Sequence, residues 1–289
     1  MNLKNKVVVI TGSTRGFGRA ITEEMLSAGA RVVVSGRKQI VVDSVVSELD
    51  QQGRVSGRAC DVSVADEVYA LARFAVEKYG QIDIWINNAG ITPTAGGILD
   101  FAPEVAEQTF RVNCIGTFNG TQAALHYMKP LRRGTIVSLY GRGSDLRPAT
   151  PSGLYGATKA WITSFTRTMA KEYAHLGVQF VGFSPGMMYT DMLDVNEVVG
   201  EQIRETMKSF PLVLKALGSP PEVPARELVR LLETNNKAFV EYKFMRGLRL
   251  VKMLAKFAWL GINKKARPAP QKYEFLRAFE APVEGRDEK

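Results

Sequence analysis

The sequence predicts an α/β protein with a doubly wound parallel sheet of about seven strands, helices on both faces and a C-terminal helical extension. Short apolar runs of strand length recur along the chain, and segments with helical apolar periodicity lie between most of them. Alternation of strand and helix over this length is typical of a parallel sheet with both faces covered by helices. Ligands of such sheets bind beyond the carboxyl ends of the strands, so we expect the functional residues there.

The expected elements follow one another in a regular order. Strands are expected at residues 7–10, 31–35, 55–60, 82–86, 135–139, 178–183 and 238–240, with helices between most of them, including 64–79, 105–128 and 157–175. We expect residues 1–240 to form the main domain, with a substrate lid at 193–220. Residues 241–289 are expected to form a basic amphipathic helical extension.

The composition is typical of a soluble globular protein, with 45% hydrophobic and 23% charged residues among 289. No apolar run reaches the length needed to span a membrane. Because the first expected strand begins at Val7, the sequence leaves no room for a targeting peptide. We therefore expect a cytoplasmic protein, or one in an organelle stroma if a transit peptide has been removed.

Charge and ligand-type residues narrow the classes of partner. The net charge of +9 is compatible with nucleic acid, an anionic cofactor or an anionic membrane surface. The sequence has no nucleic-acid-binding motif, so we expect no nucleic acid. Cys60 and Cys114 lie far apart in apolar contexts, which is expected of buried thiols in a reducing compartment. His126 and His175 are not spaced so as to form a metal site with these cysteines, and we expect no metal.

A glycine-rich turn follows the first expected strand. Gly12, Gly16 and Gly18 precede a segment with helical periodicity. Glycine permits a sharp turn and lets a pyrophosphate approach the backbone, while the free N–H groups and the dipole of the following helix favour a phosphate. By itself, the Gly-x-x-x-Gly-x-Gly spacing also fits an ordinary strand–helix connection.

Basic residues stand where the second expected strand ends. Folds that bind NAD carry an acidic residue here for the adenosine ribose, but this chain has Arg37 and Lys38, with Arg15 in the glycine turn on the same side. Arginine matches the geometry of a phosphate, so this arrangement favours NADP(H) over a solvated surface cluster. Asp61 and Val62 follow the third strand, where Asp61 is expected to hold the adenine amino group, to cap the next helix, or both.

Several motifs occur in one order: Thr11-Gly12-x-x-x-Gly16-x-Gly18, Asn87-Asn88-Ala89-Gly90, Asn113, Tyr155-x-x-x-Lys159, Pro185-Gly186 and Thr190. The ordered set resembles the short-chain dehydrogenase/reductase family over about residues 4–192, and implies a Rossmann-type fold. The expected cofactor-binding residues are Gly12, Ser13, Thr14, Arg15, Gly16, Phe17, Gly18, Arg37, Lys38, Asp61, Val62, Asn88, Ala89, Gly90, Tyr155, Lys159, Pro185, Gly186, Met188 and Thr190.

The resemblance also implies the chemistry of a pair of residues. Tyr155 and Lys159 lie one helical turn apart on one face, and an ammonium beside the phenol, together with the positive nicotinamide, is expected to lower the pKa of Tyr155. By resemblance, Tyr155 protonates the carbonyl oxygen as hydride arrives, and Lys159 binds the nicotinamide ribose. Asn113 would anchor a chain of waters that resupplies the proton. An amphipathic helix surface is the alternative interpretation of the Tyr-x-x-x-Lys spacing alone.

One position departs from the family pattern. The family places a serine after the fifth strand to hold the substrate oxygen, and Gly141 aligns with it here. Ser144, three residues later, is the nearest hydroxyl on the loop, and we take it as the candidate. The alternative is that Tyr155 and backbone N–H groups hold the substrate oxygen alone. Losing one such donor typically costs about a hundredfold in rate.

A narrower resemblance concerns the substrate. The loop over residues 141–144 that lacks the usual serine, together with the tail after Pro221, resembles the chlorophyll b reductases, which use NADPH to reduce a 7-formyl group. We therefore expect an NADPH-dependent reductase of an aldehyde or ketone on a bulky, apolar small molecule. Two alternatives are a ketoreductase of 3-oxo-lipid or acyl substrates and an NADP(H)-binding regulatory or scaffold protein without activity.

The tail supports two interpretations of its own. Residues 243–260 have helical periodicity, with Arg246, Arg249, Lys252 and Lys256 on one side of a broad apolar arc. A basic amphipathic helix with aromatic residues is typical of an interfacial membrane anchor, and we consider peripheral membrane contact through residues 243–267. The alternative is a helix whose apolar face covers the active site or a subunit interface. By resemblance, a homodimer or homotetramer is expected.

Overall fold

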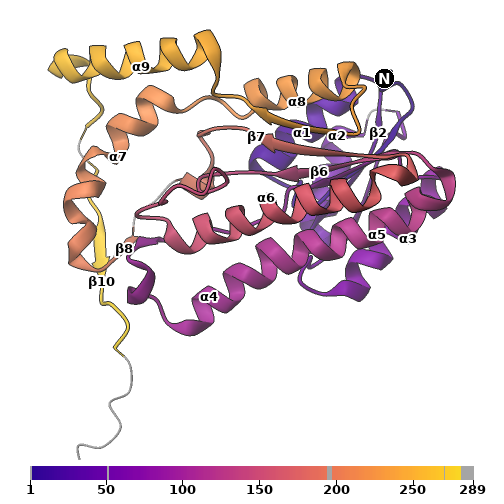
Figure 1. Cartoon of the computed structure of the whole chain (residues 1–289), viewed down its shortest axis with the longest axis horizontal. Helices are drawn as coiled ribbons and strands as arrows, with labels where there is room; N and C mark the ends of the chain where they lie inside the picture. The colour runs from indigo at the N-terminus through magenta and orange to yellow at the C-terminus, as the bar shows by residue number, and fades with distance from the viewer. Residues whose placement is uncertain (1, 51, 194–196, 270, 281–289) are drawn as a thin grey trace, which may run out of the picture.

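The computed structural model describes residues 2–50, 52–193, 197–269 and 271–280. Its centre is a seven-stranded sheet in the order β3-β2-β1-β4-β6-β7-β9, in which every pairing is parallel (Figure 1). The strands are β1 (Val7–Ile10), β2 (Arg31–Gly36), β3 (Val55–Ala59), β4 (Ile84–Asn87), β6 (Gly134–Leu139), β7 (Val178–Ser184) and β9 (Phe239–Lys243). The predicted fold class is confirmed, and the expected strands differ from these only at their ends.

Each face of the sheet buries its own core because successive side chains of a strand point to opposite faces. Val8 and Ile10 of β1 pack with α1 (Gly16–Ser27), α2 (Gln39–Leu49) and α8 (Glu222–Thr234). Val9 packs on the other face with α3 (Ala65–Tyr79), α5 (Gly116–Leu131) and α6 (Gly153–Tyr173). Since β1 pairs with β2 on one side and β4 on the other, the strand order reverses at β1, which is where doubly wound sheets bind ligands.

The helix expected at 105–128 is interrupted. The structure has α4 (Pro103–Phe110), a π-helical turn (Arg111–Ile115) and then α5. An apolar pattern cannot distinguish one widened turn from a regular helix, so the sequence predicted continuity where the backbone inserts a π turn. Asn113 lies inside this turn.

The expected lid region contributes one strand to a second, small sheet. Strands β5 (Ala95–Gly96), β8 (Glu197–Val199) and β10 (Glu274–Leu276) pair in the order β10-β8-β5, and α7 (Arg204–Leu217) follows β8. Val198 and Met207 are buried between the small sheet and α7. Part of the expected lid, residues 194–196, lies outside the described residues. Strands of two or three residues that pair with a distant tail carry no periodicity, so the sequence did not indicate them.

The expected C-terminal helix is present, but it starts later. β9 extends to Lys243, and α9 (Gly247–Ile262) begins after it, so the helix covers less of the basic stretch than predicted. Short 3₁₀ turns complete the structure at Ile98–Asp100, Ala174–Leu176, Asp191–Leu193, Glu201–Ile203 and Lys264–Ala266. Among the described helices, none combines the length and the apolar character that crossing a bilayer requires. Cys60 and Cys114 are both buried free thiols, as predicted.

Candidate active site

A cleft of about 910 Å³ lies at the carboxyl ends of β1, β2, β4 and β6. It is lined by most of the predicted residues: Gly12, Thr14, Arg15, Gly16, Phe17, Gly18, Arg37, Lys38, Asp61, Val62, Asn88, Ala89, Gly90, Tyr155, Lys159, Pro185, Met188 and Thr190. Four predicted residues do not line it, namely Ser13, Asn113, Ser144 and Gly186. The glycine turn and the Tyr-x-x-x-Lys pair therefore border one continuous space.

The glycine turn is held by very close packing. Gly12 has a φ of +62°, and a Cβ on Gly18 would lie 2.4 Å from both the Gly12 carbonyl and the Asn88 Nδ2. That Nδ2 donates to the carbonyls of Thr11 (2.8 Å) and Gly12 (2.9 Å). The Thr11 hydroxyl accepts the backbone N–H groups of Asn88 and Ala89, both at 3.0 Å. Gly12 and Gly18 therefore leave no room for a side chain, and the turn can present bare backbone to a pyrophosphate.

Ser13 supports the cradle from behind. Its hydroxyl is buried, donates to the Ile10 carbonyl at 2.8 Å and accepts the Ser35 N–H at 2.9 Å. The Ser13 hydroxyl thereby ties the turn to β2, and it is not available to a ligand in the cleft. Thr11 was not among the predicted site residues, although it belongs to the quoted motif. A hydroxyl directly before a glycine turn is the signal that could have identified it.

The three predicted phosphate-binding cations differ in their surroundings. Arg37 and Lys38 are exposed at the mouth of the cleft, and their side chains form no ion pair with any residue that the structure describes. Arg15 lies 3.4 Å from Asp191, but both side chains are about three-quarters exposed, so this pair contributes little energy. Arg37 and Lys38 are therefore available to an anion.

Asp61 organises the turn before α3, and its contact with the adenine amino group stays a prediction. Its Oδ1 accepts the Ser63 N–H at 2.9 Å and the Ser63 hydroxyl at 2.7 Å, which organises the turn that leads into α3. The same residue lines the cleft next to Val62. The capping residue of α3 is Val64, so the expectation that Asp61 caps this helix is wrong, because its carboxylate is engaged by Ser63 in the preceding turn.

Tyr155 and Lys159 project from α6 toward the end of β6. The Lys159 ammonium is buried, donates to the Leu139 carbonyl at 2.9 Å and lies 5.4 Å from the centre of the Tyr155 ring. The Tyr155 hydroxyl lies over Gly141, where a Cβ would approach it to 2.6 Å. The phenol and the ammonium thus lie together in the wall of the cleft, at the carboxyl end of β6.

Burial controls the proton affinity of both groups. Desolvation raises the pKa of Tyr155 to about 12 and lowers the pKa of Lys159 to about 8. The expected lowering of the Tyr155 pKa is therefore wrong for the protein alone. The reason is that the loss of water around the phenol outweighs any help from the ammonium, which is itself poorly solvated and bonds to a backbone carbonyl.

Asn113 lies behind the cleft and not in its wall. Its Nδ2 donates to the Ile91 carbonyl at 2.9 Å and to the Thr158 hydroxyl at 3.0 Å, and its Oδ1 accepts the Ile91 N–H at 2.8 Å. The π turn aims this fully buried amide at both segments. Asn113 therefore positions the cleft residue Ile91 and the residue next to Lys159, and its role in a water chain stays a prediction.

The loop that lacks the usual serine is closed on itself. The Ser144 hydroxyl accepts the Gly141 N–H at 2.9 Å and donates to the Lys159 carbonyl at 3.4 Å. The Tyr140 hydroxyl donates to Glu241 at 3.0 Å, behind the sheet end. A role of Ser144 on a substrate oxygen stays a prediction, and it would require the hydroxyl to leave both partners.

The cleft is also lined by the segments after β4 and β7, which contribute both apolar residues and the polar residues Thr92, Thr94 and Asp191. Met188 and Thr190 line it as predicted, together with Ile91, Pro93 and Met192, which the sequence did not indicate. Gly186, with a φ of +79°, packs against Met245 instead of facing the cleft. The described residues contain no group of His, Cys, Asp and Glu side chains able to hold a metal ion.

Comparison with known proteins identifies a family and several relatives. The profile of a family described as short chain dehydrogenase matches residues 6–198. The "Probable chlorophyll(ide) b reductase NYC1, chloroplastic" of Arabidopsis thaliana is 34% identical over 253 residues, which cover 80% of this chain and 49% of that protein. The "Chlorophyll(ide) b reductase NOL, chloroplastic" of Oryza sativa is 34% identical over 254 residues, with 84% and 72% covered. The chain thus spans about half the length of its NYC1 relative.

Other relatives carry different names. The human "Dehydrogenase/reductase SDR family member 4" is 32% identical over 224 residues, covering 76% of this chain and 78% of that protein. Among solved structures, a 3-ketoacyl-(acyl-carrier-protein) reductase from Brucella melitensis complexed with NADH superposes with a TM-score of 0.73. It covers 84% of this chain and 97% of its own at 24% identity, so it shows the likeness of the fold.

Proposed function

Because the chain belongs to the short-chain dehydrogenase family and is therefore an oxidoreductase, we propose that it uses NADPH to reduce a carbonyl group on a bulky, apolar substrate. The proposal names the 7-formyl group of chlorophyll b as the first substrate to test, because two relatives at 34% identity are described as chlorophyll(ide) b reductases. The observation that carries the proposal is that the neighbouring side chains of Tyr155 and Lys159 line the same cleft as the glycine turn.

The chain's own residues handle the proton. The nicotinamide cofactor, when bound, supplies a hydride. With a pKa of about 12, the Tyr155 phenol is protonated at neutral pH, which is the form that donates to a carbonyl oxygen during reduction. The Lys159 ammonium would hold the nicotinamide ribose and stabilise the phenolate that donation leaves. The Asn113 amide holds the backbone at Ile91 and the helix at Thr158 in place beside Tyr155 and Lys159.

The preference for NADPH rests on Arg37 and Lys38. Two exposed cations without ion-pair partners in the described structure, beside Thr14 and Gly36 at the end of β2, offer charge-assisted bonds to a 2′-phosphate. Replacing both with alanine is expected to raise the KM for NADPH about a hundredfold and to leave the KM for NADH nearly unchanged. An equal rise for both cofactors would contradict this preference.

The substrate proposal is tested by direct turnover. Purified protein is incubated with NADPH and chlorophyllide b, and formation of the hydroxymethyl product is followed by chromatography. The apolar residues Ile91, Pro93 and Met192 in the lining of the cleft support an apolar substrate. Tyr155→Phe should lower kcat at least a hundredfold while NADPH binding, measured by fluorescence, is retained.

Two outcomes would replace the proposal. Turnover of a long-chain 3-oxoacyl thioester without turnover of chlorophyllide b would identify a lipid ketoreductase. Tight NADPH binding with no turnover of either substrate would identify a regulatory or scaffold protein.

We also propose that the chain forms a homo-oligomer through α4, α5 and α6. Phe110 and Phe118 are each 41% exposed there and pack against Trp161 and Phe165, which stack on each other. A partly exposed aromatic cluster of this kind is typical of a subunit interface. Analytical ultracentrifugation of Phe118→Glu against the unaltered protein tests it, since loss of the oligomer is expected.

A further inference from the structure

The positive charge of this protein is concentrated in one segment. Residues 243–272 contain nine Lys and Arg and no Asp or Glu, and the net charge of the whole chain is +9. The remaining residues therefore carry equal numbers of positive and negative side chains. A uniformly basic protein would indicate general attraction to anions, whereas this distribution indicates one binding surface.

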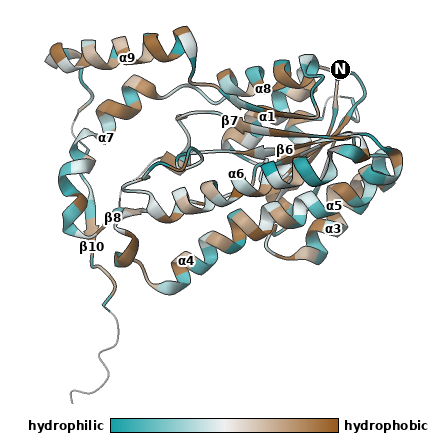
Figure 2. Cartoon of the chain, viewed as in Figure 1, coloured by the Kyte–Doolittle hydropathy of each residue, from teal (hydrophilic) through white to brown (hydrophobic). Residues whose placement is uncertain are grey.

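Helix α9 forms the centre of this segment and turns most of its apolar side chains to solvent. Leu248 is 70% exposed, Val251 59%, Leu254 53% and Ile262 84%. Figure 2 shows the helix, largely brown, at the edge of the molecule with α7 as its neighbour. Monomeric proteins seldom expose apolar side chains together in this way unless a partner covers them.

The opposite side of α9 is already fixed to the body of the protein. Leu260 is buried, and Arg249 donates to the Phe244 carbonyl and to Glu227 on α8. In the turn that follows α9 in the chain, the Ala266 carbonyl accepts a hydrogen bond from Lys215 of α7 at 2.9 Å. At about 100° per residue, Leu260 and Arg249 point away from the exposed apolar side chains. The helix therefore cannot bury its apolar face in the cleft without breaking these contacts.

Charged and aromatic side chains border the exposed apolar face. Lys252 and Lys256 are exposed and lie next to Trp259, which is 54% exposed, on the helical wheel. An apolar face with lysines beside it and a tryptophan at the boundary is typical of a helix that lies in the interface of a bilayer. We propose that the exposed face of α9, with the basic segment 243–272, binds the surface of an anionic membrane.

Charge complementarity favours a membrane over a second copy of the chain. A symmetric dimer through α9 would bring two identical segments together, each with nine cations and no acidic residue within the segment. Anionic lipid headgroups supply the missing negative charge, and their acyl chains accept the apolar side chains. Each lysine near such a surface contributes roughly a fivefold gain in affinity.

The test uses the full chain and vesicles of phosphatidylcholine, with or without phosphatidylglycerol. Sedimentation should show binding to the vesicles that contain phosphatidylglycerol, weak binding to phosphatidylcholine alone, and weaker binding at high salt. The double variant K252E/K256E should bind at least about thirtyfold more weakly. The control K129E/K171E changes the net charge equally at exposed sites outside this segment and should bind nearly as the unaltered protein does.

A second pair of variants separates the apolar contribution. Leu254→Glu should abolish binding, whereas Leu131→Glu, at a 48% exposed site on α5, should retain it. NADPH binding of each variant reports that it has folded, independently of vesicle binding. Equal affinity for both kinds of vesicle, or retained binding by Leu254→Glu, would overturn the proposal. So would a dimer in solution that Leu254→Glu dissociates while vesicles bind none of the proteins.

Discussion

At the scale of single residues, the contact between Gly141 and Tyr155 sets the geometry of the proton donor. The phenol occupies the space that a side chain at position 141 would need, with 2.6 Å between its oxygen and the nearest possible Cβ. Gly141→Ser is therefore expected to displace the hydroxyl and lower kcat by about a hundredfold, even though it introduces a hydroxyl there. The KM for NADPH should change little.

Gly141→Ala serves as the matched variant, since it adds the Cβ without the hydroxyl. Steady-state kinetics should show similar losses of kcat in both variants. A serine variant faster than the unaltered protein would mean that the phenol moves aside freely and that the loop accepts an additional hydrogen-bond donor.

Lys159 is expected to make stability depend on pH. Its pKa is about 8 in the folded protein, against 10.5 in the unfolded chain. Between these pH values the unfolded chain binds the proton that the folded protein has released, so the free energy of unfolding rises with pH. Lys159→Met should remove this rise, which amounts to at most about 3 kcal/mol. Urea unfolding at a series of pH values measures it.

A group whose pKa is raised by folding has the opposite effect on the pH dependence of stability. Tyr155, for example, lowers the free energy of unfolding as pH rises above its unfolded pKa of 10. Its contribution is the same in Lys159→Met and in the unaltered protein, so it cancels when the two are compared. Lys171→Met, at an exposed site near the end of α6, is the control and should leave the pH profile unchanged. The same slope in Lys159→Met and the unaltered protein would refute the assignment.

At the scale of elements, the turn between β1 and α1 depends on segments distant in sequence. Asn88, after β4, supplies its amide to the carbonyls of Thr11 and Gly12, and Gly18 in α1 packs directly on that amide. Gly18→Ala should therefore cost roughly 1–3 kcal/mol in the free energy of unfolding and weaken NADPH binding. Chemical denaturation and fluorescence titration measure the two effects.

Gly261 provides the control for this substitution. It also lies in a helix, but a Cβ there would meet no atom within 4 Å. Gly261→Ala should leave NADPH binding unchanged and stabilise the helix by up to about 1 kcal/mol. Similar behaviour of the two variants would show that the packing around Gly18 is not what restricts it.

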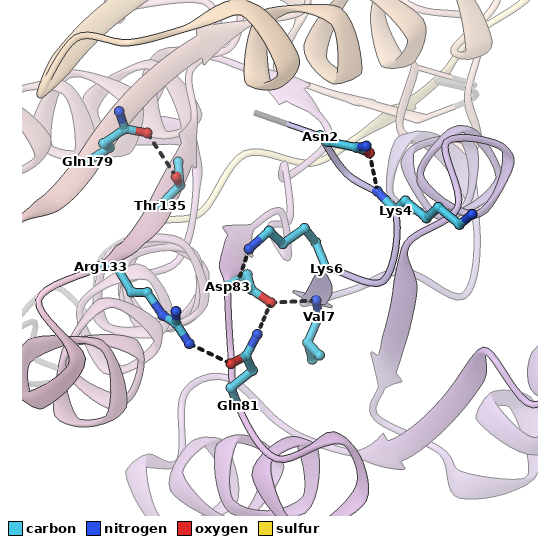
Figure 3. Close-up of polar contacts among 9 residues, drawn as sticks. All are labelled: Asn2, Lys4, Lys6, Val7, Gln81, Asp83, Arg133, Thr135 and Gln179. Carbon is cyan, nitrogen blue, oxygen red and sulfur yellow. Dashed lines mark hydrogen bonds and ion pairs between the residues drawn. The ribbon is translucent and has the colours of Figure 1, made fainter.

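At the scale of the whole molecule, the two ends of the sheet serve different purposes. The carboxyl ends form the cleft, while a polar network ties the amino ends together (Figure 3). There the buried Asp83 accepts Lys6 Nζ and the Val7 N–H, each at 2.9 Å, and the Gln81 amide at 2.8 Å. Arg133 in turn donates to Gln81 at 2.8 Å.

Removal of this carboxylate should affect stability and not function. Asp83→Ala leaves the Val7 N–H buried without its acceptor, and we expect a loss of about 2–4 kcal/mol in the free energy of unfolding. Asp83→Asn retains an acceptor and should lose less. The KM for NADPH should stay unchanged in both, because the network lies at the far end of the strands. A raised KM at unchanged stability would contradict this division.

Much of the fold and the cofactor site follows from local sequence. Apolar runs such as residues 7–10 mark buried parallel strands, and the glycines at 12, 16 and 18 mark the turn between β1 and α1, because both signals lie within a few neighbouring residues. The spacing of Tyr155 and Lys159 likewise places them on one helical face. These features were predictable without knowledge of what the segments pack against.

Contacts between distant segments were decided only by the tertiary structure. The desolvation that moves the pKa of Tyr155 upward, the engagement of Ser144 with Gly141 and Lys159, and the π turn at Asn113 depend on neighbours that are remote in sequence. The same holds for α9: its pattern predicted an amphipathic helix, but only packing determines which face is covered. Burial is a property of the assembled chain, so the sequence alone identified the chemical groups and the fold identified their environment.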